Sequence, residues 1–352
     1  MTRNKTSANM KPTAIDLFCG CGAMTEGFKR AGFNIISAVD SDRIACATYR
    51  KNHPEVLLYQ DDIISVDPLL LLSANRKKVD VVIVCAPCQP FSSLNRFKTK
   101  DERAMLIFES IRFAKKLSPR IIVFENVFGL ITSSCQSILK KLQSDLLSLG
   151  YKLGSPHMIN AADYAVPQRR RRCVMFAAKK TGIIPHLPPP VTPLGDRQTV
   201  HEAISNLQPL NSGQSSPNDI LHFSRNHTKK ALLRMKHIPE DGGSRFSLPP
   251  ELELACHKGT KSYPDVYGRM KWKDVAPTLT TGCTDITRGR FMHPRDNRAI
   301  TLREAARLQT FPDSYEFTGS PSDIATQIGN AVPVLLAETI GLAALNSVKH
   351  KR

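Results

Sequence analysis

Two cysteines three positions apart, Cys85 and Cys88, stand at the end of an apolar run in the stretch VCAPCQPFSS. The C-x-x-C spacing fits three kinds of chemistry: a redox pair, half of a zinc site, or one nucleophile beside an unrelated neighbour. A zinc site would need four ligands, and the other close pair, Cys19 and Cys21, lies inside a glycine-rich turn. The spacing therefore favours the chemistry of a thiolate over metal binding.

The surroundings of Cys88 favour a single nucleophile. A redox pair is expected at a helix N-terminus, whereas Cys85 still belongs to the apolar run and Pro87 and Pro90 flank Cys88. We therefore expect Cys85 to be buried and inert. Cys88 would stand on a rigid loop that presents its thiolate.

A second candidate site is the glycine turn in DLFCGCGAMTEGF, where Gly20 and Gly22 permit a tight bend and a close approach to a ligand. The next apolar run ends in Asp40, whose carboxylate could accept hydrogen bonds from ribose hydroxyls. The third glycine is Gly27, two positions later than a pyrophosphate-binding motif requires. We therefore predict a nucleoside cofactor without phosphates, S-adenosylmethionine. The alternative is an ordinary turn between a strand and a helix.

The elements that must position these residues alternate between strands and helices up to about residue 180. Five apolar runs are expected as strands buried on both faces, at residues 13–18, 34–40, 79–86, 120–126 and 172–178. Residues 132–150 carry an apolar helical face that ends near Gly150. The pattern predicts an α/β fold with a doubly wound, mostly parallel sheet that binds ligands at the carboxyl ends of its strands.

The pattern changes after residue 180, where a proline-rich stretch at 182–196 is expected to be a linker. We predict four parts: a disordered tail at 1–12, a catalytic and cofactor-binding domain at 13–185, a smaller irregular domain at 186–298, and a segment at 299–352 that returns to the first domain. Two helices are expected in the last segment, at 301–311 and from about Pro333 onward.

The charge of the chain points to a polyanionic partner. Lys and Arg number 49 against 31 Asp and Glu, which gives a net charge of +18 and an isoelectric point near 9.6. Nucleic acid is the expected partner, although a basic protein without such a partner would show the same balance. No run approaches the ~20 consecutive apolar residues of a membrane span. We expect a cytoplasmic, nucleoid-associated protein whose nine cysteines are mostly reduced.

Six motifs follow one another along nearly the whole chain, from about residue 13 to 345: DLFCGCG, APCQPFS, FENV, PQRRRR, REAARLQTFPD and QIGNAVP. In this order and at these separations they resemble the DNA (cytosine-5)-methyltransferases of prokaryotic restriction-modification systems. The resemblance implies the fold of S-adenosylmethionine-dependent methyltransferases. It also implies methyl transfer to C5 of cytosine in a specific sequence of double-stranded DNA. Residues 186–298 would be the target-recognition domain, which is short for the family.

The resemblance assigns roles to individual residues. The catalytic residues would be Cys88 as nucleophile, Glu125 as acid partner, Arg172 near the cytosine O2, and Arg170 as a holder of the cysteine loop or of a phosphate. The cofactor would lie against Asp16, Phe18, Gly20, Gly22, Asp40, Asp62 and Pro87, with Asn330 and Val332 closing the site. DNA would be contacted by Ser92, Gln168, Arg269, Thr281, Arg288 and Arg290, and residues 258–295 would select the sequence. No metal is implied.

The chemistry of cytosine methylation explains these residue types. A thiolate added to C6 makes C5 nucleophilic enough to take up a methyl group. The addition places charge on N3 and O2, where an acid and a guanidinium group can stabilise it. The base must first be flipped out of the duplex, and residues 92–100 are expected to form a mobile loop that closes over the DNA.

Other readings of these residues are possible. Glu125 could be a helix cap and the arginine run a solvated face. The chain could be a transfer-RNA cytosine-5 methyltransferase, although the Cys-Phe-Thr signature of that group is absent, or a catalytically dead DNA-binding relative. For a DNA methyltransferase we expect a monomer, with a cognate restriction endonuclease that acts on the same site without direct contact.

Overall fold

The computed structural model describes residues 11–72, 78–87, 102–132 and 135–349. The chain divides into two compact units. The first comprises residues 1–159, 171–189 and 337–352, and the second comprises residues 160–170 and 190–336. Residues 299–336 thus group with the second unit, whereas the expected division placed them with the catalytic domain. Most of the expected tail lies outside the described residues. The assignment of catalysis and target recognition to separate domains stays a prediction.

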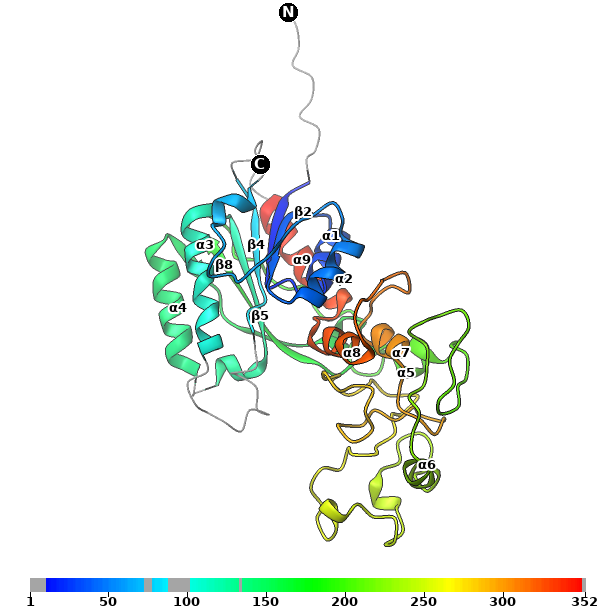
Figure 1. Ribbon diagram of the computed structural model, residues 1–352. Coiled ribbons are helices and arrows are strands. Elements are labelled where there is room, and N and C mark those ends of the chain that lie inside the picture. Colours follow the sequence, from blue (N-terminus) through cyan, green and yellow to red (C-terminus); the bar gives the residue numbers. More distant parts are fainter. Residues whose placement is uncertain (1–10, 73–77, 88–101, 133–134, 350–352) are drawn as a thin grey trace, which may run out of the picture. The chain divides into compact units, whose positions relative to one another are not determined.

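The described residues of the first unit are built on one sheet of eight strands (Figure 1). Its strands are β1 (Thr13–Leu17), β2 (Asn34–Asp40), β3 (Leu57–Gln60), β4 (Val81–Val84), β5 (Ile121–Asn126), β6 (Tyr151–Leu153), β7 (His157–Asn160) and β8 (Arg171–Lys179). The order is β3-β2-β1-β4-β5-β8-β6, with β7 beside β8. Strands β1 to β5 run parallel, and β8 runs antiparallel to β5 and β6. The predicted, mostly parallel sheet is confirmed.

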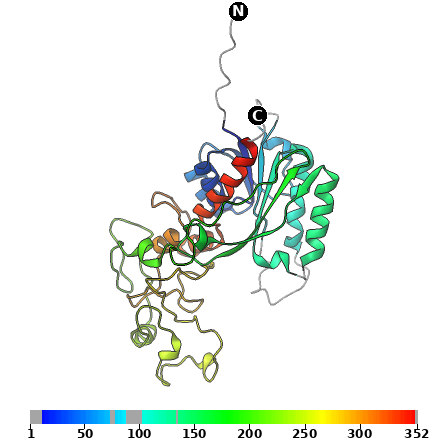
Figure 2. The same ribbon diagram turned by 180° about the vertical axis from the view of Figure 1, so that it is seen from behind.

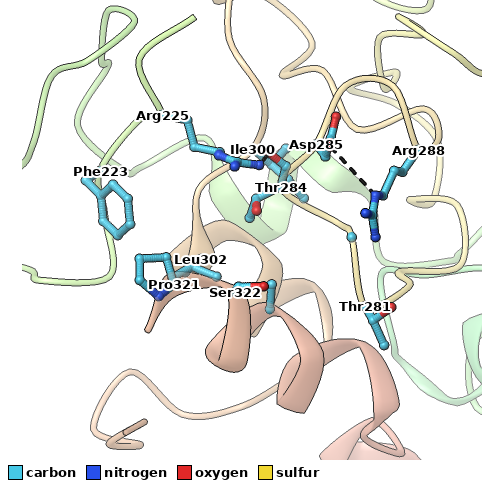
Figure 3. Close-up of a pocket in the computed structure, with 12 residues that line it drawn as sticks. Phe223, Arg225, Thr281, Thr284, Asp285, Arg288, Ile300, Leu302, Pro321 and Ser322 are labelled. Carbon is cyan, nitrogen blue, oxygen red and sulfur yellow. Dashed lines mark hydrogen bonds and ion pairs between the residues drawn. The ribbon is translucent and has the colours of Figure 1, made fainter. Parts of the chain in front are cut away.

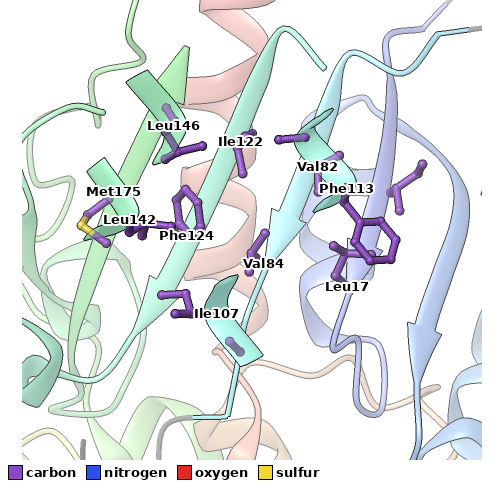
Figure 4. Close-up of a cluster of buried hydrophobic side chains, with 14 of the residues drawn as sticks. Leu17, Val82, Val84, Ile107, Phe113, Ile122, Phe124, Leu142, Leu146 and Met175 are labelled. Atoms are coloured by element: carbon purple, nitrogen blue, oxygen red, sulfur yellow. The ribbon is translucent and has the colours of Figure 1, made fainter. Parts of the chain in front are cut away.

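Helices cover both faces of this sheet, with α3 and α4 on one face and α1, α2 and α9 on the other (Figures 1 and 2). The helices of the chain are α1 (Ala23–Ala31), α2 (Arg43–Asn52), α3 (Glu109–Leu117), α4 (Gln136–Ser148), α5 (Val200–Ile204), α6 (Lys229–Lys236), α7 (Leu302–Leu308), α8 (Pro321–Asn330) and α9 (Val334–Lys349). Figure 4 shows the core between the sheet and helices α3 and α4, where Phe113 of α3 and Leu142 and Leu146 of α4 pack on side chains of the strands. Burial on both faces explains the near-continuous apolar strands.

A close contact between α1 and α9 explains the late third glycine of the turn motif. A Cβ atom on Gly27 would lie 2.4 Å from Cβ of Ala337, and one on Gly341 would lie 2.7 Å from Cβ of Ala31. Neither position can carry a side chain without moving a helix backbone. The packing of α9 on α1 therefore explains why position 27 is a glycine.

Helix α9 is apolar because it is a core helix. By length and composition alone, the stretch Pro321–Lys349, which contains α8 and α9, could cross a membrane. However, 72% of its most apolar window is buried inside the protein. The apolar character of this stretch is thus explained by its packing in the protein core.

The second unit consists mainly of loops and short helices, α5 to α8. A small apolar cluster around Met235, Tyr267 and Met292 forms part of its core. Buried arginines also hold the loops of this unit together. Arg245 and Arg298 are 3% and 1% exposed, and their guanidinium groups donate hydrogen bonds to backbone carbonyls from several loops. These bonds satisfy carbonyl groups that a sheet would otherwise pair.

Candidate active site

The glycine turn between β1 and α1 has the backbone that its sequence predicts. Gly20 and Gly22 have φ angles of 53° and 96°, and Phe18 also adopts a positive φ of 61°. The left-handed region costs glycine little, which explains the glycines. No heavy atom lies within 4 Å of the place where a Cβ of Gly20 would be. The turn therefore leaves open space beside its backbone, as a bound nucleoside requires.

Asp40, the last residue of β2, is attached to this turn. Its Oδ2 accepts a hydrogen bond of 2.7 Å from the backbone N–H of Gly20, and its Oδ1 accepts one of 2.8 Å from the N–H of Asp42. A carboxylate has about four acceptor sites, so both oxygens can still accept hydroxyl groups. Burial raises the pKa of Asp40, while the hydrogen bonds from Asp42 and Gly20 oppose the rise. The geometry fits the predicted contact with ribose hydroxyls.

Asp16, another predicted cofactor residue, lies inside β1 and is fully buried. Its Oδ2 accepts a 2.8 Å hydrogen bond from the Thr25 hydroxyl, which also lies 2.8 Å from the hydroxyl of Tyr49. Burial raises the pKa of Asp16 to about 7, and the bond from Thr25 opposes the rise. Asp16 therefore braces α1 against β1 through Thr25, beneath the glycine turn.

Other predicted cofactor residues follow the ends of parallel strands. Phe18, Asp62 and Pro87 come shortly after β1, β3 and β4, and the carboxyl ends of parallel strands share one edge of a sheet. Asp62 is exposed, and its Oδ1 accepts a hydrogen bond from the N–H of Ile64. Asn330 and Val332 belong to the second unit, so their place beside the cofactor stays a prediction.

The cysteine stretch begins at the same edge. Strand β4 ends at Val84, so Cys85 lies just beyond it and is half-buried, not buried inside the strand as expected. The N–H of Cys85 donates to the carbonyl of Leu17 in β1 at 3.4 Å. Cys88 and Ser92 lie outside the described residues.

Glu125 and Arg172 meet at the end of β5. Nε of Arg172 lies 3.0 Å from Oε1 of Glu125, and both side chains are largely buried, with 12% and 8% exposed. The antiparallel register pairs Glu125 with Val174, so Arg172, two residues earlier on β8, is the diagonal neighbour of Glu125 on the same face of the sheet. A charge pair shielded from water is strong electrostatically. The structure thus brings together two of the four predicted catalytic residues.

Asn126 is a positioning residue that the sequence reasoning missed. Its side-chain amide is buried and donates a 3.2 Å hydrogen bond to the carbonyl of Ala86, two residues before Cys88. Its Oδ1 accepts from the N–H of Val127. Asn126 therefore ties the start of the cysteine stretch to the strand that carries Glu125. Its place directly after Glu125 was the available signal.

Gln168 and Arg170 brace loops of the second unit. Gln168 is fully buried, and its side chain bonds the N–H of Leu279 and the side chain of Gln309. Arg170 is 2% exposed and donates to the carbonyls of Leu279 and Gly329 at 2.9 Å each. The predicted contacts of Gln168 with DNA and of Arg170 with a phosphate stay predictions, which these buried hydrogen bonds do not support. Any hold of Arg170 on the cysteine loop stays a prediction.

Arg269, predicted to contact DNA, is 1% exposed. Its guanidinium group donates to five backbone carbonyls and one side-chain oxygen, those of Met235, Ile238, His293, Arg295, Asp296 and Asn297. Burial lowers its pKa, and the nearby acids Glu240 and Asp296 oppose this effect. The structure therefore gives Arg269 a structural role, and its contact with DNA stays a prediction.

Arg290 is held in a similar way. Its Nε lies 2.9 Å from Asp265, and its Nη1 donates to the carbonyls of Gly242, Gly243 and Arg269. Its side chain is 23% exposed. These bonds occupy most of the guanidinium group, so the part available to DNA is small.

Thr281 and Arg288, in contrast, are exposed and line a pocket in the second unit (Figure 3). Of the residues predicted to contact DNA, Gln168 and Arg269 are thus buried, whereas Thr281 and Arg288 are exposed. Among the described residues, no group of three or more His, Cys, Asp or Glu could hold a metal ion. Burial raises the pKa of Cys21 to about 12, which disfavours a thiolate ligand there.

Residues 13–346 match the family model of the C-5 cytosine-specific DNA methylases. The chain belongs to this family. Type II methylase M.HgiDII of Herpetosiphon aurantiacus is 38% identical to this methylase over 340 residues, which cover 94% of either chain. Type II methyltransferase M1.HphI of Haemophilus parahaemolyticus is 35% identical over 340 residues, covering 96% of this chain and 87% of its own.

Solved structures show the same fold for the methylase. A prophage-encoded protein of Escherichia coli, assigned as a DNA modification methyltransferase, superposes with a TM-score of 0.76 at 25% identity, over 96% of this chain and 99% of its own. The methyltransferase EhMeth of Entamoeba histolytica has a TM-score of 0.65 at 17% identity, over 97% of this chain and its full length. The methylase therefore methylates C5 of cytosine in DNA, with S-adenosylmethionine as methyl donor.

Proposed function

We propose that this methylase acts on a cytosine flipped out of a specific sequence of duplex DNA, through a covalent bond between Cys88 and C6. The observation that carries the proposal is the ion pair of Glu125 and Arg172 at 3.0 Å. It lies at the carboxyl end of β5, next to β4, which leads into the cysteine stretch. Flipping follows from the chemistry, because C5 and C6 are stacked inside a duplex.

Each side chain has a defined task in this mechanism. The Cys88 thiolate adds to C6 while Glu125, as a carboxylic acid, supplies a proton to N3. The Arg172 guanidinium donates to O2 and stabilises the charge that develops there. S-adenosylmethionine supplies the methyl group to C5. A base then removes the C5 proton, the N3 proton returns to the Glu125 carboxylate, and the C5–C6 double bond re-forms as the thiolate leaves.

The binding roles follow the same division. The glycine turn and Asp40 would hold the cofactor, because the turn is open beside Gly20 and the Asp40 oxygens can accept more hydrogen bonds. The exposed basic residues of the second unit would bind the DNA backbone, and residues 258–295 would select the sequence. We further propose a cytoplasmic monomer whose modified sites are spared by a cognate restriction endonuclease.

The test uses duplex DNA in which 5-fluorocytosine replaces cytosine. Addition and methyl transfer can proceed, but C5 then carries fluorine in place of a removable proton, so elimination is blocked. The wild-type protein should remain attached to the DNA on denaturing electrophoresis. Cys88→Ser should form no adduct, because a hydroxyl is hardly ionised at neutral pH. Cys85→Ser is the matched control and should still form it.

Two outcomes would contradict the mechanism. An adduct with Cys88→Ser but none with Cys85→Ser would make Cys85 the nucleophile. If both variants fold and neither reacts, the two cysteines act as a pair. Transfer of a tritiated methyl group to transfer RNA but not to duplex DNA would replace the proposed substrate.

A further inference from the structure

A pocket of about 150 Å³ opens in the second unit, lined on one side by the loop from Thr281 to Arg288 and on the other by the first turn of α8 (Figure 3). The apolar side chains of Ile300 and Leu302 belong to its wall, and both residues are buried. Arg225, which no sequence motif singled out, lines the same pocket. The pocket thus combines an apolar wall with two guanidinium groups.

Both arginines of the pocket are weakly held. Arg225 is exposed, and its one described hydrogen bond runs from Nη1 to the carbonyl of Thr284 at 3.5 Å. Arg288 is 64% exposed, and its Nε lies 3.7 Å from Oδ2 of Asp285. The other oxygen of Asp285 accepts from the N–H and the hydroxyl of Thr287 at 2.9 and 2.8 Å. The pocket lining therefore contains two arginines and one carboxylate, that of Asp285, which leaves it a net positive charge.

The contrast with the other arginines of this unit points to a ligand. Arg269 and Arg298 are buried, and their N–H groups donate hydrogen bonds to carbonyl or carboxylate oxygens of the protein. Arg225 and Arg288 have the same donor groups but leave most of them to solvent. A guanidinium group with free donors forms two parallel hydrogen bonds to a phosphate readily.

We infer that Arg225 and Arg288 bind one backbone phosphate of the DNA at this pocket, with the adjoining deoxyribose against the wall formed by Ile300 and Leu302. The inference rests on the proposed function, because it takes duplex DNA as the substrate. A phosphate contact positions the duplex on the unit and carries no sequence information of its own. The two arginines therefore set affinity and register, while other side chains read the bases.

The experiment measures the affinity for duplex DNA by fluorescence anisotropy over a series of salt concentrations. Each phosphate neutralised by the protein contributes about −0.9 to the slope of log K against log[salt]. If the two arginines share one phosphate, Arg225→Gln and Arg288→Gln should each weaken binding, and the double variant should lose about 0.9 of slope in total. The sequence that is methylated should not change.

Matched variants separate the effect of this pocket on DNA binding from the effect of the total charge of the protein. Replacing both residues by lysine keeps the two positive charges, so the slope should return to the wild-type value while part of the affinity stays lost. Lys116→Gln removes one exposed charge from α3 and should leave the slope of the DNA-binding plot unchanged. Thermal midpoints equal to that of the wild type would show that the glutamine variants fold.

Three results would overturn the inference. An unchanged slope in the double variant would mean that the pocket does not bind DNA. A loss near 1.8 would mean that the arginines contact two separate phosphates. A changed methylation site would mean that they read bases. If the wild-type protein itself neither bound nor methylated duplex DNA, the proposed function would fall together with the inference.

Discussion

Arg172 lies 3.0 Å from Glu125, and the antiparallel pairing of β8 with β5 is what brings these two side chains together. The family places its acid and its guanidinium group at positions far apart in the sequence. Here they form one largely buried ion pair, in which the guanidinium group orients the acid. The pair makes the first prediction possible.

Glu125→Gln should lower kcat by roughly 10²- to 10⁴-fold, because the amide cannot transfer a proton to N3. The affinity for duplex DNA should change little, since the side chain keeps its size. Arg171→Gln is the matched control, because Arg171 is the exposed neighbour of Arg172 on β8 and should leave kcat unchanged. A Glu125→Gln enzyme with wild-type kcat would remove Glu125 from the mechanism.

Asp40→Ala should weaken S-adenosylmethionine binding by roughly 10- to 100-fold, the effect expected from losing charge-assisted hydrogen bonds. The variant also releases the N–H of Gly20 from its 2.7 Å bond, which loosens the turn. Asp42→Ala is the control: Asp42 caps α2 by accepting from the N–H groups of Ile44 and Ala45, so its loss should lower stability and spare cofactor affinity. Calorimetry measures both cofactor affinity and stability. An Asp40→Ala variant that binds S-adenosylmethionine as tightly as the wild type would refute the role of Asp40.

The buried carboxyl of Asp16 should make stability depend on pH. Its pKa is about 7 in the folded protein against an ordinary value of 3.8, so the folded state holds the proton more tightly. The stabilising contribution is therefore complete below pH 4 and is lost as the pH rises to about 7, by at most about 4 kcal/mol. Relative to the wild type, Asp16→Asn should gain stability between pH 5 and pH 8 in urea unfolding.

A second variant checks this assignment. Thr25→Val removes the hydrogen bond that lowers the pKa of Asp16, so the loss of stability should continue to a higher pH. If the difference in unfolding free energy between wild type and Asp16→Asn is the same at every pH, Asp16 does not titrate in this range.

Arg269→Lys should destabilise the second unit by several kcal/mol, because a buried ammonium group cannot satisfy the same set of carbonyls. The affinity for duplex DNA should stay at the wild-type value in the fraction that remains folded, since Arg269 has almost no exposed surface. Arg288→Lys should show the reverse, with normal stability and weaker DNA binding. Weaker DNA binding with normal stability in Arg269→Lys would instead support the predicted contact.

The catalytic sheet could be predicted from the sequence because its central strands are buried on both faces and therefore read as continuous apolar runs. Strand β3 was missed because it lies at the edge of the sheet, where Leu57 and Gln60 are exposed and the apolar signal disappears. Strand β6 has only three residues, too few for a periodic pattern. Helix α8 was also missed, although Ser320 and Asp323 form a capping box at its start.

The site divides in the same way. The residue types and spacing of the glycine turn and the cysteine stretch indicated their chemistry, because these residues are local in sequence. Burial, in contrast, is set by distant parts of the chain. Nothing near Arg269 or Arg288 in the sequence shows that one is enclosed by carbonyls and the other open to solvent. Arg225 was missed for this reason as well, since only the folded chain places it beside Arg288 at one pocket.

The packing of α9 on α1 has a consequence for synthesis on the ribosome. The face of α1 that carries Gly27 and Ala31 is completed by Ala337 and Gly341, which emerge only after the whole second unit has been translated. At roughly 5–20 residues per second, that face stays uncovered for tens of seconds. The nascent chain must therefore keep an apolar surface from aggregating during that time. A chain truncated before α9 would leave this face of α1 uncovered.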